Sequence, residues 1–251
     1  MTVHFIGAGP GAADLITVRG QRLLQRCPVC LYAGSIMPKD LLAQCPPDAK
    51  IVDTGPLTLD QILAEFVEAD AAGHDVARLH SGDPSLYSAL AEQCRRLDAL
   101  GIDYEIVPGV PAFAAAAAAL KRELTVPGVA QTVTLTRVST LSTAMPPGED
   151  LTTLARAGAT LVLHLAAAQI DHIVPQLLAG GYAAQTPTAV VAFASWPQQI
   201  VLRGTLSDIA GQMHQANVTK TAVIIVGDVL GAEGFTDSYL YSVARRSTGA
   251  H

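Results

Sequence analysis

The turn at residues 81–84, with the sequence Ser-Gly-Asp-Pro, constrains the fold of this chain more than any other stretch. It follows an alternating run at residues 75–79 that is typical of a β-strand. Apolar residues then recur every three or four positions, which predicts a helix over residues 84–100. A strand, a tight turn and a helix in this order indicate a parallel α/β sheet. In such sheets ligands bind outside the carboxyl ends of the strands, so the turn is a candidate binding site.

The residue types in this turn fit two interpretations. Gly82 would let a ligand approach the backbone closely. Asp83 would either cap the predicted helix or accept hydrogen bonds from a ligand. Pro84 suits the first position of a helix. The turn alone therefore fits both a binding loop and an ordinary capped connection between a strand and a helix.

Hydrophobic patterning along the whole chain predicts an α/β fold with two domains. Residues 1–120 alternate between strand-like and helix-like runs, which predicts a mostly parallel sheet. In residues 121–251 two strand-like runs are separated by only a few residues around Ser195-Trp-Pro197, which predicts a hairpin and hence a mixed sheet. The predicted strands are residues 2–6, 29–32, 50–53, 75–79, 102–107, 132–136, 160–165, 188–193, 199–203 and 222–226.

Composition excludes several classes of protein. The formal net charge of −6 argues against nucleic acid as the main partner, because phosphate contacts need clustered Lys and Arg. We see no apolar run of about 20 residues and no signal peptide, so we expect a cytoplasmic protein without membrane spans. Cys27-Pro-Val-Cys30 has no second pair or suitably spaced histidines, so we predict buried, reduced thiols and no metal site.

The Gly-rich segment at residues 7–12 superficially matches a dinucleotide-binding loop. Such a loop needs an acidic residue at the end of the second strand to hold the ribose, and residues 33–35 after that strand are Ala-Gly-Ser. Pro10 also removes one backbone donor that a phosphate would use. The segment is therefore poorly equipped for NAD or FAD. A Rossmann-type oxidoreductase remains as an alternative from a different functional class.

Three segments together resemble the N-terminal signatures of the tetrapyrrole methylase family: residues 3–19, 78–84 and 107–112. The resemblance extends over nearly the whole chain. It implies a methyltransferase that uses S-adenosylmethionine, with a ligand cleft between two α/β domains, a small-molecule tetrapyrrole substrate and a homodimeric assembly.

One further sequence, Tyr-Ala-Gly-Ser at residues 32–35, resembles the branch of that family that methylates precorrin-4 at C11 in cobalamin biosynthesis. The open alternatives are a sister enzyme acting at another ring position, the enzyme for the cobalt-containing substrate of the anaerobic route, and a non-catalytic tetrapyrrole carrier.

The resemblance also assigns site residues, although the chain departs from sirohaem-type relatives in having Ala33 in place of Asp and Pro111 in place of Thr. It identifies no catalytic base; Tyr32, Ser35 and His80 are guesses, and Arg122 and Arg137 are further candidates for binding substrate carboxylates. The residues expected to contact the cofactor are Pro10, Ser81, Gly82, Asp83, Leu86, Pro111, Ala112, Leu165, Ala194, Thr221 and Ala222. Those expected to contact the substrate are Gly9, Gly11, Tyr32, Ser35, Lys39 and Arg78.

Overall fold

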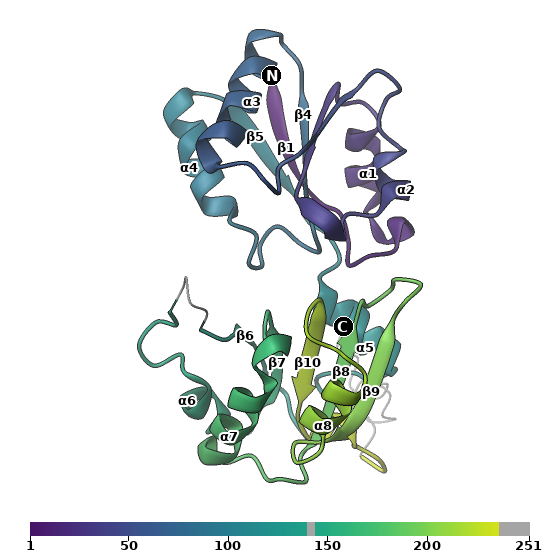
Figure 1. Cartoon of the computed structure of the whole chain (residues 1–251), viewed down its shortest axis with the longest axis vertical. Coiled ribbons are helices and arrows are strands. Elements are labelled where there is room, and N and C mark those ends of the chain that lie inside the picture. The colour runs from purple at the N-terminus through teal and green to yellow at the C-terminus, as the bar shows by residue number, and fades with distance from the viewer. Residues whose placement is uncertain (140–143, 236–251) are drawn as a thin grey trace, which may run out of the picture. The chain divides into compact units, whose positions relative to one another are not determined.

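The computed structural model describes residues 1–139 and 144–235, and the chain divides into two compact units (Figure 1). Unit 1 contains residues 1–115 together with 195–197, and unit 2 contains residues 116–194 and those from 198 onward. The division near the middle of the chain falls between Ala115 and Ala116, inside helix α5 (Ala112–Leu120). The boundary predicted from the sequence lies near Leu120, at the end of the same helix. None of the helices in the described ranges combines the length and the hydrophobicity that crossing a membrane requires.

Unit 1 is built on a parallel sheet of five strands in the order β3-β2-β4-β1-β5. Strand β1 lies between β4 and β5, with Gly7 opposite His80 and Ile6 opposite Val107. The carboxyl ends of these three strands therefore come to the same edge of the sheet. The strands are β1 (Thr2–Gly7), β2 (Val29–Tyr32), β3 (Lys50–Asp53), β4 (Val76–His80) and β5 (Asp103–Val107).

Helices cover both faces of this sheet, with α1 and α2 on one face and α3 and α4 on the other (Figure 1). The alternation along β1 explains the arrangement, since Ile6 packs among residues of α1 while Phe5 packs against Phe66 of α3. A capping box begins α3, in which the Thr58 hydroxyl accepts from the Gln61 backbone N–H. The helices are α1 (Val18–Leu24), α2 (Lys39–Leu42), α3 (Leu59–Ala71) and α4 (Leu90–Leu100).

Unit 2 carries the predicted mixed sheet, with strands in the order β6-β7-β10-β8-β9. Only β6 and β7 run parallel, and the predicted hairpin is confirmed as the antiparallel pair of β8 and β9. Helix side chains such as Ile173, Leu177 and Met213 pack on the buried strands to form its core. The strands are β6 (Val133–Arg137), β7 (Thr160–His164), β8 (Pro187–Ala192), β9 (Ile200–Thr205) and β10 (Ala222–Val226), and the further helices are α6 (Leu151–Ala155), α7 (Ile170–Gly180) and α8 (Ile209–Gln215).

The helix predicted over residues 84–100 is wrong in its first third. Helix α4 begins only at Leu90, and Pro84 lies in a turn rather than at the first helical position. Tyr87 and Ala89 both have a positive φ of 52°, which no α-helix contains. The Asp83 carboxylate, expected as a possible helix cap, instead accepts the N–H of Ser85 and of the distant Gly109. These bonds turn the chain away from the helical path.

Three glycines allow the loops at this edge of the unit 1 sheet to approach one another closely. A Cβ atom on Gly109 would lie 2.2 Å from the carbonyl oxygen of Gly82 and 2.7 Å from the Cα atom of Gly7. A Cβ atom on Gly7 would lie 2.5 Å from the Cα atom of Gly109. Since the obstructing atoms belong to the backbone, any larger residue at either position would have to push two loops apart.

We therefore predict that Gly109→Ala lowers the free energy of unfolding by about 1–3 kcal/mol, the usual effect of overpacking. Gly211→Ala is the matched control, because Gly211 lies in α8 with open space where the Cβ would be placed. This control should be neutral or stabilising by up to about 1 kcal/mol, since alanine favours helices. Urea denaturation followed by circular dichroism measures both. Equal stability of the two variants would contradict the steric argument.

Candidate functional site

The Gly-rich segment, the Ser-Gly-Asp-Pro turn and residues 107–112 meet at the carboxyl edge of the unit 1 sheet. Gly9 and Gly82 form an isolated antiparallel bridge, in which the Gly82 N–H donates to the Gly9 carbonyl at 2.8 Å and the Gly9 N–H donates back at 3.2 Å. A Cβ atom on Gly82 would lie 3.7 Å from both Pro111 Cα and Ala112 N. The loops after β1, β4 and β5 are thus packed against one another through their main chains, and Gly9, Gly11 and Gly82 are buried there. Predicted site residues on these loops are Gly9, Pro10, Gly11, Ser81, Gly82, Asp83, Leu86, Pro111 and Ala112.

Asp83 connects two of these loops through its carboxylate. Its Oδ2 atom accepts the Gly109 N–H at 2.7 Å, and its Oδ1 atom accepts the Ser85 N–H at 2.9 Å and the Ser85 hydroxyl. Burial opposes ionisation of this carboxyl group, but the hydrogen bonds from Ser85 and Gly109 outweigh it and lower the pKa of Asp83 below its usual value. The carboxylate is therefore ionised at neutral pH and holds the Ser81–Asp83 turn against the loop after β5.

The Gly-rich loop lacks the helix N-terminus that a dinucleotide phosphate requires, and some of its main-chain groups are already hydrogen-bonded. The Ala12 N–H donates to the Ser195 hydroxyl at 2.9 Å, and the Trp196 indole N–H donates to the Pro10 carbonyl at 3.1 Å. No α-helix follows directly, because a short 3₁₀ turn intervenes and α1 begins at Val18, capped by the Thr17 side chain. This arrangement removes the structural basis for the NAD- or FAD-dependent alternative.

The Tyr-Ala-Gly-Ser turn after β2 is held by a carboxylate that sequence reasoning missed. Asp53, at the end of the neighbouring strand β3, accepts the backbone N–H of Gly34 at 3.0 Å and of Gly55 at 2.8 Å. These two donors lower the pKa of Asp53. Thr54 adds a hydrogen bond from its N–H to the Tyr32 carbonyl at 2.7 Å. The sequence offered one signal for this role, because Asp53 is an acidic residue at the end of the strand next to β2.

The remaining substrate candidates of unit 1 differ in their surroundings. Lys39 is exposed at the first residue of α2. Arg78 is buried in β4, with 4% of its surface exposed, and donates to the side chains of Gln93 and Thr54. His80, one of the guesses for a base, is also buried, and burial lowers its pKa to about 3. A histidine with this pKa is neutral at pH 7 and a weak base.

Predicted cofactor residues of unit 2 gather at one edge of its sheet. Strands β7 and β8 both pair antiparallel with β10, so the carboxyl ends of β7 and β8 and the amino end of β10 coincide there. Leu165 and Thr221, at this edge, both adopt a positive φ of 53°, which is strained for these residue types. Leu165 also leaves 64% of its surface exposed. Strain and exposed apolar surface together favour a ligand contact. The predicted residues at this edge are Leu165, Ala194, Thr221 and Ala222.

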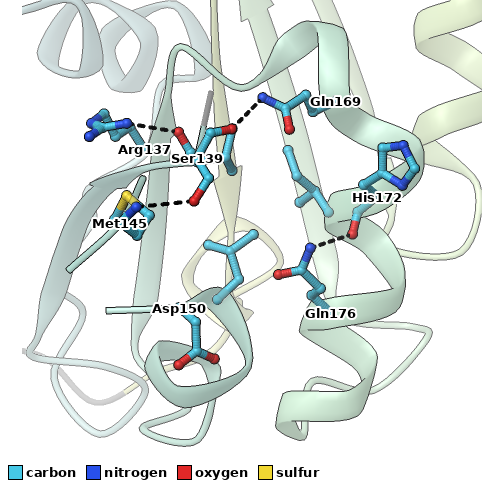
Figure 2. Close-up of a pocket in the computed structure, with 10 residues that line it drawn as sticks. Arg137, Ser139, Met145, Asp150, Gln169, His172 and Gln176 are labelled. Carbon is cyan, nitrogen blue, oxygen red and sulfur yellow. Dashed lines mark hydrogen bonds between the residues drawn. The ribbon is translucent and has the colours of Figure 1, made fainter. Parts of the chain in front are cut away.

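A small pocket in unit 2 contains Arg137, one of the candidates for binding substrate carboxylates (Figure 2). The Arg137 guanidinium donates to the Val138 carbonyl at 3.0 Å, and Gln169 donates to the Ser139 carbonyl at 2.8 Å. The pocket holds about 100 Å³, well below the roughly 300–1,000 Å³ of typical ligand sites. Its polar groups are hydrogen-bonded to the main chain of the pocket wall at Val138, Ser139 and Met145.

Cys27 and Cys30 are buried, as the sequence predicted, whereas Cys45 and Cys94 are partly exposed. Cys27 and Cys30 lie in the core between α1 and the sheet, and all four cysteines are free. Burial raises the pKa of Cys27 to about 12, so it remains a thiol at neutral pH. Within the described ranges, no group of three or more potential ligand side chains could hold a metal ion.

The role of Asp83 gives a direct prediction. Asp83→Ala would leave the Gly109 N–H without its acceptor and free the turn that carries Ser81 and Gly82. If S-adenosylhomocysteine contacts this turn, as the resemblance to the methylase family implies, its affinity should fall roughly 10- to 100-fold, the equivalent of one charge-assisted hydrogen bond. Isothermal titration calorimetry measures the change. Asp150→Asn is the matched control, because Asp150 also accepts backbone and hydroxyl hydrogen bonds but caps α6 in unit 2. Wild-type affinity in Asp83→Ala would contradict this role.

Comparison with known proteins agrees with the signatures in the sequence. A family model described as Tetrapyrrole (Corrin/Porphyrin) Methylases matches residues 2–210. A precorrin-4 C(11)-methyltransferase of Mycobacterium tuberculosis is 84% identical over 245 residues, covering 98% of each chain.

Two solved structures resemble the fold. A cobalt precorrin-4 methyltransferase has a TM-score of 0.89 at 38% identity, covering 91% of this chain and 95% of its own. A uroporphyrin-III C-methyltransferase of Thermus thermophilus, complexed with S-adenosylhomocysteine, has a TM-score of 0.79 at 28% identity, covering 92% of this chain and 99% of its own. Because the family model spans most of the sequence and the mycobacterial relative aligns along almost all of it, the chain belongs to the tetrapyrrole methylase family.

Proposed function

We propose that this protein is the S-adenosylmethionine-dependent methyltransferase of cobalamin biosynthesis that methylates precorrin-4 at C11 to give precorrin-5. The observation that carries the proposal is the 84% identity over 98% of the chain to a precorrin-4 C(11)-methyltransferase. The solved cobalt precorrin-4 methyltransferase is only 38% identical. This difference favours the cobalt-free substrate over that of the anaerobic route.

S-adenosylmethionine is the proposed methyl donor, supported by the family and by the relative complexed with S-adenosylhomocysteine. In unit 1 the proposed contacts lie on the Ser81–Asp83 turn and at Pro10, Leu86, Pro111 and Ala112. Ser81 is exposed beside the buried Gly82, so this turn presents a hydroxyl and the edge of its main chain to a ligand. Leu165, Ala194, Thr221 and Ala222 of unit 2 are assigned to the same cofactor by resemblance, and their strained, partly exposed edge supports that assignment.

The proposed methyl transfer depends mainly on how the protein positions the cofactor and the substrate. When bound, the cofactor supplies an activated methyl group on a sulfonium, and an electron-rich ring carbon of the substrate attacks it. Holding the carbon, methyl and sulfur in line can supply roughly 7–11 kcal/mol of the barrier. Loops fixed by backbone bridges and by the Asp83 and Asp53 carboxylates suit this task, because they hold a ligand without rearranging. We assign no catalytic base.

A homodimer and a cytoplasmic location remain predictions from the sequence.

Turnover tests the proposed reaction. Incubation with methyl-labelled S-adenosylmethionine and an enzymatic system that generates precorrin-4 should give a product carrying one new methyl group. Nuclear magnetic resonance should place that methyl at C11, and the cobalt-containing substrate offered in parallel should react more slowly. Methylation at another ring position would point to a sister enzyme. Binding of the tetrapyrrole without any methyl transfer would point to a carrier and refute the proposal.

Trp196 offers an independent readout of cofactor binding, since it is the single tryptophan of the chain and its indole donates to the Pro10 carbonyl. If Pro10 borders the cofactor, S-adenosylhomocysteine should change the intrinsic tryptophan fluorescence in a saturable manner, and NADH should not compete. Trp196→Phe should abolish the signal while calorimetry still detects binding. A fluorescence signal that is unchanged at saturating S-adenosylhomocysteine would place the cofactor away from Pro10.

A further inference from the structure

The guanidinium of Arg78 is held in a fixed orientation inside unit 1. Its Nε atom donates to the Gln93 side-chain oxygen at 3.1 Å, and its Nη1 atom donates to the Thr54 hydroxyl at 2.8 Å. Both partners are buried and are themselves anchored. Thr54 donates to the Tyr32 carbonyl at 2.9 Å, and Gln93 donates to the Ala89 carbonyl at 3.0 Å. The guanidinium is thus tied to the Tyr-Ala-Gly-Ser turn on one side and to the start of α4 on the other.

This buried cation has no anionic partner in the part of the chain that the structure describes. Gln93 and Thr54 are neutral, and no described carboxylate lies within 4.0 Å of Arg78. Burial lowers the pKa of Arg78 to about 10, so the side chain is still charged at neutral pH. Arginine is almost never buried this fully without a partner, because an uncompensated buried charge is strongly unfavourable. The arrangement therefore calls for an anion.

The surroundings of Arg78 have other features of a ligand site. Among the described residues the Nη2 atom donates no hydrogen bond, and the Nε2 atom of the neighbouring His80 is buried without a partner. His80 is neutral, so it does not compete for an anion. The chain between β4 and α4 is strained at Tyr87 and Ala89. Such strain concentrates at ligand clamps.

We propose that Arg78 is a carboxylate-binding residue, with its Nε and Nη1 atoms anchored by Gln93 and Thr54 and its Nη2 atom left to receive a carboxylate of a ligand. The inference rests on the proposed function, which brings two carboxylate-bearing molecules to the protein. One is the amino-acid end of the cofactor, and the other is the acidic periphery of the tetrapyrrole. Both present the same chemistry, and binding measurements separate them.

Gln93→Glu is the decisive variant, because it places a carboxylate beside the guanidinium with almost no change in volume. The new carboxylate would pair with Arg78 inside the protein. It should therefore raise or preserve the melting temperature and should compete with the carboxylate of the ligand for the guanidinium. We expect affinity for one ligand to fall roughly 10- to 100-fold. Calorimetric titrations with S-adenosylhomocysteine and with uroporphyrin III, a stable polycarboxylate tetrapyrrole, identify which one. Gln131→Glu, at an exposed site in unit 2, is the matched control and should change neither affinity.

A second comparison isolates the carboxylate itself. If the cofactor supplies it, decarboxylated S-adenosylhomocysteine should bind wild type and Gln93→Glu equally, whereas the intact molecule should not. Arg78→Lys keeps the charge but cannot hold both anchors. It should weaken the same ligand, which keeps the test valid if Gln93→Glu does not fold. Unchanged affinity for both ligands in a folded variant would make Arg78 a purely structural residue and overturn the proposal. Failure of the proposed methylation would instead appear as absent turnover in the wild type.

Discussion

The close contact of three glycine backbones at the carboxyl edge of the unit 1 sheet is the constraint on which the rest of that unit depends. Gly7, Gly82 and Gly109 end three adjacent strands or begin the loops after them, and a Cβ atom on Gly7 or Gly109 would clash with main-chain atoms of the others. The contact lets the Gly9–Gly82 bridge form and brings the Gly109 N–H to the Asp83 carboxylate. Glycines that suggest a phosphate-binding loop are thus used for packing one loop against another.

The sequence predicted most of the fold because its elements are set by local patterns. Strands at residues 29–32, 50–53 and 222–226 have the predicted bounds, since short apolar runs flanked by turn residues leave little freedom. The prediction that the helix begins at Pro84 was wrong because of an interaction between residues far apart in the sequence. The periodicity favoured a helix, but the acceptor that redirects the chain, Asp83, binds Gly109, 26 residues further along. No window of neighbouring residues contains that interaction.

The candidate site was less predictable than the fold. Asp53 was missed because it stabilises a turn that follows a different strand, and only the pairing of β2 with β3 brings the two together. Ser195 reaches the Gly-rich loop across 183 positions. In unit 2 the apolar Leu165 and Ala194 would be assigned to the core by residue type alone. That assignment suits Ala194, which is buried, but not Leu165, which is exposed in a strained conformation. Resemblance to a family supplied what residue chemistry did not.

The segment from Arg78 to Gln93 combines several features that are unfavourable for stability. It contains a buried cation with no carboxylate within 4.0 Å in the described part of the chain, and two non-glycine residues in the left-handed region, next to well-packed strands. A glutamate at position 93 would fit the same space and relieve the electrostatic part of this cost. A chain that keeps glutamine there retains a positive potential in a low-dielectric environment, where an incoming carboxylate interacts more strongly than it would in water. Arg78 thus lowers the stability of the fold beside the Tyr-Ala-Gly-Ser turn, which is proposed to contact the substrate. A local loss of stability of this kind is expected at a binding site rather than at a purely structural position.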